Sequence, residues 1–144
     1  MQVRVGKGDR GLRALAGAVD DFCSSHSVAD DVRHDLHVAL DEIVNNVVRH
    51  AAPRHPRIEV RLAADDTHVE VVIVDDGEPF DLHDAPAPDV TLPIEQRRVG
   101  GLGVYLVRQL MDDVVYRRSD GENRLTLRRR LRGPRPARGP ASAL

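Results

Sequence analysis

The chain has 144 residues, of which 41% are hydrophobic, enough for one globular domain with a sizeable core. It has no tryptophan and only 3% aromatic residues, so aliphatic side chains must form that core. No apolar run approaches the roughly 20 residues that span a bilayer, and the N-terminus carries no export signal. The single cysteine, Cys23, cannot form an internal disulfide, and we expect it to be buried on a helix. These features predict a cytoplasmic protein without a membrane partner.

The net charge of −2 conceals an uneven distribution. Residues 128–144 hold six of the 21 basic residues and no acid, so residues 1–127 carry 15 basic and 23 acidic side chains, a net charge of −8. An acidic body argues against nucleic acid as a direct partner. The Arg-, Pro- and Gly-rich end cannot build a core. We therefore expect one domain at 1–131 and a disordered tail at 132–144.

The first half of the chain predicts a short strand and two helices. Residues 3–5 read as an edge strand. Apolar residues at helical spacing follow Asp9. A second, longer helix is predicted to be capped by Ser27 or Asp30 and to end before Pro53, which cannot continue it.

The second half predicts two hairpins with a helix between them. The segments are a hairpin at 57–64 and 69–74, a helix at 102–111, and a hairpin at 114–118 and 124–131. The polar stretch 81–99 is long enough to be a lid or binding loop. The predicted fold is an α+β two-layer sandwich, with a mixed, mainly antiparallel sheet and helices on one face.

Three polar residues recur along the second helix at a spacing of four. Glu42, Asn46 and His50 should project from one face, with the flanking apolar residues toward the core. A carboxylate and an amide oxygen one turn apart can hold a general base near a magnesium-bound phosphate, because Mg²⁺ prefers hard oxygen donors. An ordinary solvated helix face is the alternative.

The second motif, Asp75-Asp76-Gly77, follows the most apolar strand of the chain. A carboxylate at the end of a buried strand can accept a hydrogen bond from an exocyclic amine, and Gly77 lets backbone approach a flat ring. A simple turn is the alternative, since Asp-Gly is a common turn pair.

The third motif, Gly100-Gly101-Leu102-Gly103, stands where the long loop meets a helix. Glycines there leave backbone N–H groups free to face an anion, aided by the helix dipole. A lid hinge is the other interpretation. A Walker A loop is excluded because the only lysine is Lys7, and a dinucleotide fingerprint is excluded because position 106 is Leu. The scattered histidines lack the spacing of a zinc site.

Taken together, the order and spacing of the three motifs resemble the ATP site of the GHKL (Bergerat-fold) superfamily, which includes gyrase, Hsp90, histidine kinases and MutL. The segment from Leu40 to Ala51 resembles the N-box, and residues 75–81 and 100–104 resemble the two glycine boxes. The short length and the wording Asp-x-Gly-x-Pro-Phe-Asp make the chain most similar to the anti-sigma-factor serine kinases (RsbW/SpoIIAB-like).

The resemblance implies a role for each matching residue. It implies that Glu42 is the general base, that Asn46 is the Mg²⁺ ligand, and that Asp75 binds the adenine amino group of ATP beside Gly77. The second glycine box, residues 100–103, would lie beside the phosphates. The γ-phosphate would be met by an arginine just before that box. The candidates for that arginine are Arg97 and Arg98, Arg49 is a weaker phosphate candidate, and His50 is counted among the nucleotide-binding residues.

The resemblance also implies partners and a reaction. The expected activity is phosphoryl transfer from Mg-ATP to a serine or threonine of an anti-anti-sigma protein of the STAS type, and the second partner would be a sigma factor sequestered by the kinase. Homodimers are frequent in the family. Three alternatives stay open: a nucleotide-gated anti-sigma binding module without turnover, a histidine-kinase-like catalytic domain, and an α/β interaction domain with coincidental motifs.

Overall fold

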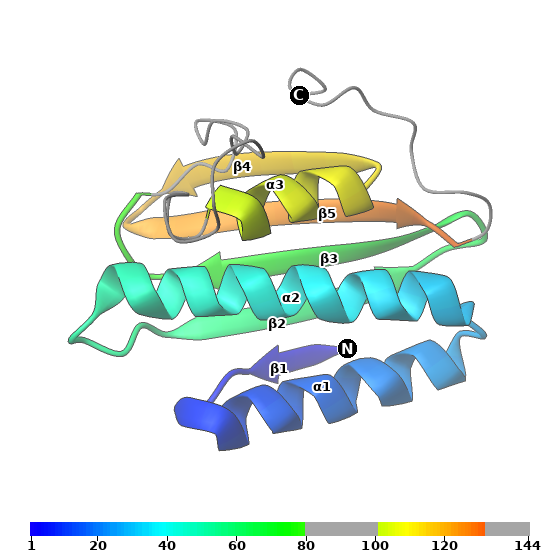
Figure 1. Ribbon diagram of the computed structural model, residues 1–144, viewed down its shortest axis with the longest axis horizontal. Helices are drawn as coiled ribbons and strands as arrows, with labels where there is room; N and C mark the ends of the chain where they lie inside the picture. Colours follow the sequence, from blue (N-terminus) through cyan, green and yellow to red (C-terminus); the bar gives the residue numbers. More distant parts are fainter. Residues whose placement is uncertain (80–100, 132–144) are drawn as a thin grey trace.

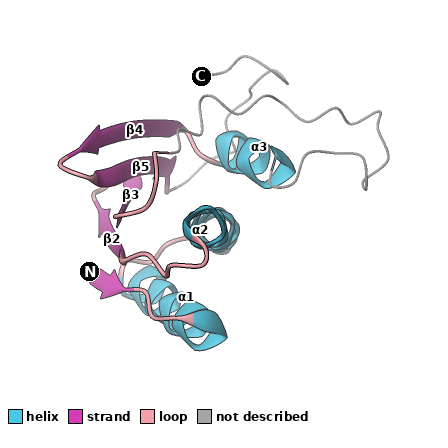
Figure 2. Cartoon of the chain, turned by 90° about the vertical axis from the view of Figure 1, so that its left-hand side faces the viewer, coloured by secondary structure: helices cyan, strands magenta, loops and turns pink. Residues whose placement is uncertain are grey.

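The chain folds into two layers, a sheet and a set of helices that cover one of its faces (Figures 1 and 2). The computed structural model describes residues 1–79 and 101–131, and in the helix that begins at Gly101 it describes side chains from Tyr105 onward. The predicted loop at 81–99 and the predicted tail at 132–144 lie outside these residues. No helix in the described part is long and apolar enough to cross a membrane.

The elements follow the predicted order, with ends that differ by a few residues. They are β1 (Gln2–Arg4), α1 (Gly8–Ser25), α2 (Asp30–Ala51), β2 (Ile58–Ala64), β3 (His68–Asp75), α3 (Gly101–Leu110), β4 (Asp113–Ser119) and β5 (Glu122–Arg130). The strand order is β1-β2-β3-β5-β4, and each neighbouring pair in the described sheet is antiparallel. The α+β fold with a mainly antiparallel sheet is therefore confirmed.

One prediction about α2 is wrong. The residue at its N-cap is Ala29, and no side chain makes a capping hydrogen bond. Asp30 is already the first helical residue, and Ser27 sits in the preceding turn with a φ of 52°. Asp30 and Asp31 still place negative charge in the first turn, where it interacts favourably with the helix dipole. The helix ends at Ala51, before Pro53 as predicted.

The last hairpin has a tight turn at Asp120–Gly121. Both residues have positive φ, 54° and 76°, as a two-residue turn between twisted antiparallel strands requires. Glycine adopts this conformation at little cost, and aspartate tolerates it better than most residues. The turn fixes Asn123 opposite Arg118 across the hairpin.

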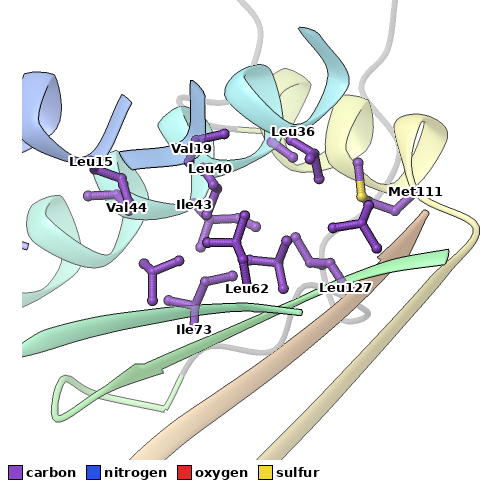
Figure 3. Packing of buried hydrophobic residues seen from close by; sticks show 14 of the residues in the cluster. Leu15, Val19, Leu36, Leu40, Ile43, Val44, Leu62, Ile73, Met111 and Leu127 are labelled. Carbon is purple, nitrogen blue, oxygen red and sulfur yellow. The ribbon is translucent and has the colours of Figure 1, made fainter. Parts of the chain in front are cut away.

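The core lies between the helices and the inner face of the sheet (Figure 3). Leu15 and Val19 of α1 and Leu40 of α2 lie above Leu62 and Ile73 of the strands (Figure 3). The strands alternate buried and exposed positions because only one face of the sheet is covered by helices. Aliphatic side chains dominate this core, as the composition predicts, and Cys23 is buried in it without a disulfide.

Candidate functional site

The three elements that carry the sequence motifs meet at one end of the sheet. The second half of α2, the end of β3 and the start of β5 lie together at the left of Figure 1, and α3 begins toward the same end. A pocket opens there between α2 and the strands. It is lined by Ile43, Asn46, Val47, His50, Ile73, Asp75, Gly77, Glu78, Tyr116, Asn123 and Leu125. Aliphatic side chains and a few convergent polar groups make it suitable for a flat, mostly apolar ligand with polar edges.

Asp75 is the buried acid of this pocket, with 6% of its surface exposed. Its Oδ1 accepts hydrogen bonds from the Gly77 backbone N–H at 2.9 Å and from Asn123 Nδ2 at 2.9 Å. Within residues 1–79 and 101–131, its Oδ2 makes no hydrogen bond. Burial raises the pKa of the Asp75 carboxyl above 3.8, although the two hydrogen bonds act in the opposite direction. Oδ2 is thus an acceptor for which this part of the chain supplies no donor.

The neighbouring acid, Asp76, is tied to the chain itself. Its Oδ1 accepts from the Arg57 backbone N–H at 2.7 Å and from Arg54 at 3.3 Å, and Arg54 also donates to the Asp76 carbonyl at 2.8 Å. Burial acts to raise the pKa of Asp76, but the hydrogen bonds from Arg57 and Arg54 outweigh it and the pKa is lowered. Asp76 therefore anchors the turn after β3, while Asp75 faces the pocket.

Asn123 is a site residue that sequence reasoning missed, because the predicted hairpin, with strands at 114–118 and 124–131, leaves position 123 in the connecting turn. It is 5% exposed and lies directly opposite Asp75 in the register of β3 and β5. Its Oδ1 accepts hydrogen bonds from Tyr116 Oη at 2.5 Å and from Arg118 at 3.0 Å. Nothing local in the sequence pairs β3 with β5, since α3 and β4 lie between them along the chain. The Asp-Gly turn fixes only the Arg118–Asn123 pairing.

Asn46 is buried at the α2 side of the pocket. It is 3% exposed, so the alternative interpretation, an ordinary solvated helix face, does not hold for this residue: this part of α2 faces the sheet, and Asn46 stands beside Ile43 and Val47 in the pocket wall. Its Oδ1 accepts a hydrogen bond from Arg49, whereas its Nδ2 is buried without a hydrogen-bond partner in the described part of the chain. A buried amide that is only half satisfied is unusual and marks a place where a ligand group can bind.

The other two residues of the helical motif lie in different surroundings. His50 is exposed and lines the pocket, one turn beyond Asn46. Glu42 is half-buried, does not line the pocket, and makes no hydrogen bond or ion pair with the described residues. The structure thus brings Asn46, His50, Asp75 and Gly77 together and leaves Glu42 one turn away. Arg49 is exposed and contacts the site through Asn46.

The second glycine box is described only in part. Gly101, Leu102 and Gly103 form the first turn of α3, so these glycines are helical and not in a loop. Their backbone N–H groups are at a helix N-terminus, as the anion-binding interpretation requires. Gly100, Arg97 and Arg98 lie outside the described residues.

The residues present fit a magnesium–nucleotide. An aminopurine ring matches the pocket's apolar walls, and its amine matches the open acceptor Asp75 Oδ2. For Mg²⁺, Asn46 Oδ1 in the pocket wall is a hard amide oxygen that accepts from Arg49 and keeps a second lone pair, and a metal that keeps several waters needs few protein ligands.

The chain is similar to a family of ATPase domains and to several named protein kinases. A family model described as a histidine kinase-like ATPase domain matches residues 7–129. The serine-protein kinase RsbW of Bacillus licheniformis is 36% identical over 93 residues, covering 59% of this chain and 56% of that protein. The serine/threonine-protein kinase BtrW of Bordetella bronchiseptica is 36% identical over 98 residues, covering 67% of this chain and 69% of that protein.

The match is partial in length. The chain spans 54% of a further RsbW, from Oceanobacillus iheyensis, at 36% identity, so it covers little more than half of these RsbW proteins. The family match, by contrast, extends over most of the chain, from the residue before α1 to the end of β5. It contains the complete pocket described above. The chain therefore belongs to the histidine kinase-like ATPase domain family.

Proposed function

We propose that the chain is an ATP-dependent serine/threonine-protein kinase that acts in partner switching. Its substrate would be a STAS-type anti-anti-sigma protein, and it would also act as an anti-sigma factor by sequestering a sigma factor. The observation that supports the nucleotide site best is the open acceptor of Asp75 in a pocket that also holds the half-satisfied amide of Asn46. The names of the relatives, a serine-protein kinase and a serine/threonine-protein kinase, support the choice of reaction.

The nucleotide would bind with its base in the pocket. Asp75 Oδ2 would accept a hydrogen bond from the adenine amine. A Cβ at position 77 would lie 3.0 Å from Asp75 Oδ1, so glycine there leaves room for the base beside the backbone. The phosphates would extend toward Asn46 and the first turn of α3. Asn46 would hold Mg²⁺ there, and the cation would neutralise part of the phosphate charge.

Glu42 would take the proton of the acceptor hydroxyl. It is half-buried one turn from Asn46 and has no partner in the described part of the chain, so its carboxylate is available to a substrate that approaches α2 from outside the pocket. The hydroxyl oxygen of the partner's serine or threonine would attack the γ-phosphorus as the bond to the β-phosphate oxygen breaks, leaving ADP. Positioning and electrostatics provide most of the acceleration in such reactions.

The consequence for the partner is electrostatic. Phosphorylation adds roughly −1.5 to −2 charges at neutral pH. Residues 1–127 of this chain carry a net charge of −8, so a phosphorylated partner would be repelled and released. The kinase would then be free to hold a sigma factor.

The test is transfer of labelled γ-phosphate from Mg-ATP. The purified chain is incubated with an extract from its own source, and the labelled products are treated with acid. We expect acid-stable label on a small second protein, and we expect that label to disappear with the Glu42→Gln variant. Acid-labile label would instead indicate histidine-kinase chemistry. Binding of ATP without any label transfer would indicate a nucleotide-gated binding module.

A further inference from the structure

Every hydrogen-bonding group of the Asn123 side chain is in use. Its Nδ2 donates to Asp75 Oδ1 at 2.9 Å and to the Glu78 carbonyl at 2.8 Å, with the Gly77 carbonyl further away at 3.4 Å. Its Oδ1 accepts from Tyr116 and Arg118. A primary amide has two donor hydrogens and two acceptor lone pairs, so the side chain is saturated.

The orientation of this amide is dictated by its neighbours. A flipped amide would turn its oxygen toward the Asp75 carboxylate and the Glu78 carbonyl, which only accept. It would also turn its NH₂ toward the Arg118 guanidinium, which only donates. Arg118 is itself held in place by a second hydrogen bond, to the Gly77 carbonyl at 2.8 Å. These neighbours therefore require the NH₂ group of Asn123 to face Asp75 and its Oδ1 to face Arg118.

The carboxylate of Asp75 is oriented in turn. Asn123 and the Gly77 backbone N–H both bind Oδ1, so rotation of the carboxylate would break two hydrogen bonds. Within residues 1–79 and 101–131 the other oxygen, Oδ2, has no donor and is left for a ligand. Asn123 thereby favours the orientation that presents Oδ2 to the ligand, and its donated hydrogen bond favours the ionised carboxylate, in which Oδ2 can only accept.

We propose that Asn123 is the positioning residue that sets the purine selectivity of this pocket, by holding Asp75 so that Oδ2 is presented as an acceptor only. Adenine carries a donating amine at its six-position and is favoured, whereas guanine carries a carbonyl oxygen there and is repelled. The inference rests on the proposed function in that the ligand is a purine nucleotide. Tyr116 and Arg118 contribute by fixing the amide of Asn123.

The experiment measures the dissociation constants of ATP and GTP, each with Mg²⁺, by titration calorimetry. For the wild-type chain we expect a clear preference for ATP. Asn123→Leu keeps the branching at Cγ, is somewhat larger and removes both donors, and should reduce the ratio of ATP affinity to GTP affinity by about tenfold, the equivalent of about 1.4 kcal/mol. The loss arises because an Asp75 without its partner can rotate or become protonated and then donate to guanine.

Asn123→Asp is a sharper variant because it changes donors into acceptors without changing shape. Two facing carboxyl groups will share a proton, and a protonated Asp75 can donate. We expect this variant to lose ATP affinity and to lower the ratio of ATP affinity to GTP affinity further than Asn123→Leu does. The matched control is Asn45→Asp, an exposed asparagine on α2 whose amide donates only to the Asp41 carbonyl. It should leave the ratio unchanged.

A second readout is the pH dependence of ATP affinity. Wild-type affinity should fall as Asp75 is protonated, and Asn123→Leu should move that fall to higher pH, because a hydrogen bond that favours the ionised carboxylate has been removed. The titratable or charged groups that face Asp75 are Asp76 and Glu78 of its own segment, His50 of α2, and Tyr116 and Arg118 of β4. None of them is altered in the wild-type chain or in Asn123→Leu, so the difference between these two profiles reports on Asn123.

The outcomes separate this inference from the proposed function. If the wild-type chain binds ATP selectively but Asn123→Leu weakens ATP and GTP equally and keeps the same pH profile, Asn123 has only a structural role and the inference is wrong. If the wild-type chain binds neither nucleotide, both the inference and the proposed function are wrong. Tyr116→Phe, which removes one bond to Asn123 but none of its donors, should narrow the ratio less than Asn123→Leu. Thermal unfolding of each variant identifies loss of binding through unfolding.

Discussion

Arg129 and Asp35 form an ion pair inside the core, with Arg129 Nε 3.3 Å from Asp35 Oδ2 and both side chains fully buried. The pair joins the end of β5 to the first half of α2. Arg129 also brings its Nη1 to 3.8 Å from Asp112, at the junction of α3 and β4. One guanidinium thus connects three elements far from the nucleotide pocket.

Removal of one partner of this pair should be strongly destabilising. Asp35→Ala leaves a buried guanidinium without its nearest carboxylate, and we expect a loss of about 3–5 kcal/mol in the free energy of unfolding. Denaturant titration measures it. The matched control is Glu70→Ala, which removes the exposed partner of Arg128 at 3.8 Å and should cost no more than about 1 kcal/mol. If Asp35→Ala lowered the free energy of unfolding by no more than the small loss expected for Glu70→Ala, the buried pair would contribute little to stability.

Two glycines of α1 should respond in opposite directions to alanine. A Cβ at Gly11 would lie 1.9 Å from the Gly6 carbonyl oxygen, so Gly11→Ala must displace backbone and should destabilise the chain by about 1–3 kcal/mol. At Gly17 a Cβ would meet nothing within 4 Å, and Gly17→Ala should stabilise the helix by up to about 1 kcal/mol. Midpoints of denaturant unfolding measure both. A stabilising Gly11→Ala would show that the segment between β1 and α1 does not closely approach Gly11 in solution.

The general-base assignment predicts a separation of binding from turnover. Glu42→Gln should reduce phosphoryl transfer by about 10²–10⁴-fold, because a general base contributes that much, and should leave ATP affinity nearly unchanged, since Glu42 does not line the pocket. The control is Asp41→Asn on the adjacent exposed position. Label transfer and calorimetry on the same preparations measure the two effects. Normal transfer by Glu42→Gln would remove Glu42 from the mechanism.

The ionisation of Asp75 predicts a pH dependence of nucleotide binding. The pKa of this carboxyl is raised by burial, so its charged form is lost on acidification at a higher pH than for an ordinary aspartate. ATP affinity should therefore decline as the pH falls through that raised pKa. Asp75→Asn should bind ATP weakly at every pH and show no such decline. Calorimetric titrations from neutral to acidic pH test this, and a wild-type affinity that is flat over the range would contradict it.

The sequence predicted what depends on local pattern. Strand and helix order followed from periodicity, and Asp75 and Asn46 were assigned from motifs whose spacing is local. Asn123 could not be found in this way, because its function depends on a pairing of β3 with β5 across an intervening helix and strand. The cap of α2 was misassigned because Ser, Asp and Ala stand close together there, and the path of the backbone, not the residue types, decided which became the N-cap.

The place of β5 in the sheet has a consequence for synthesis of the protein. The last strand of the described chain is inserted between β3 and β4, so β3 has only one strand neighbour until residues 122–130 have emerged from the ribosome. Until then the valine-rich edge of β3 stays unpaired, a state that is prone to association with other chains. Asp75 also lacks Asn123 during that interval. A nascent chain can therefore complete the pocket only after residues 122–130 have been synthesised, and a fragment that stops before residue 122 should be unable to form it.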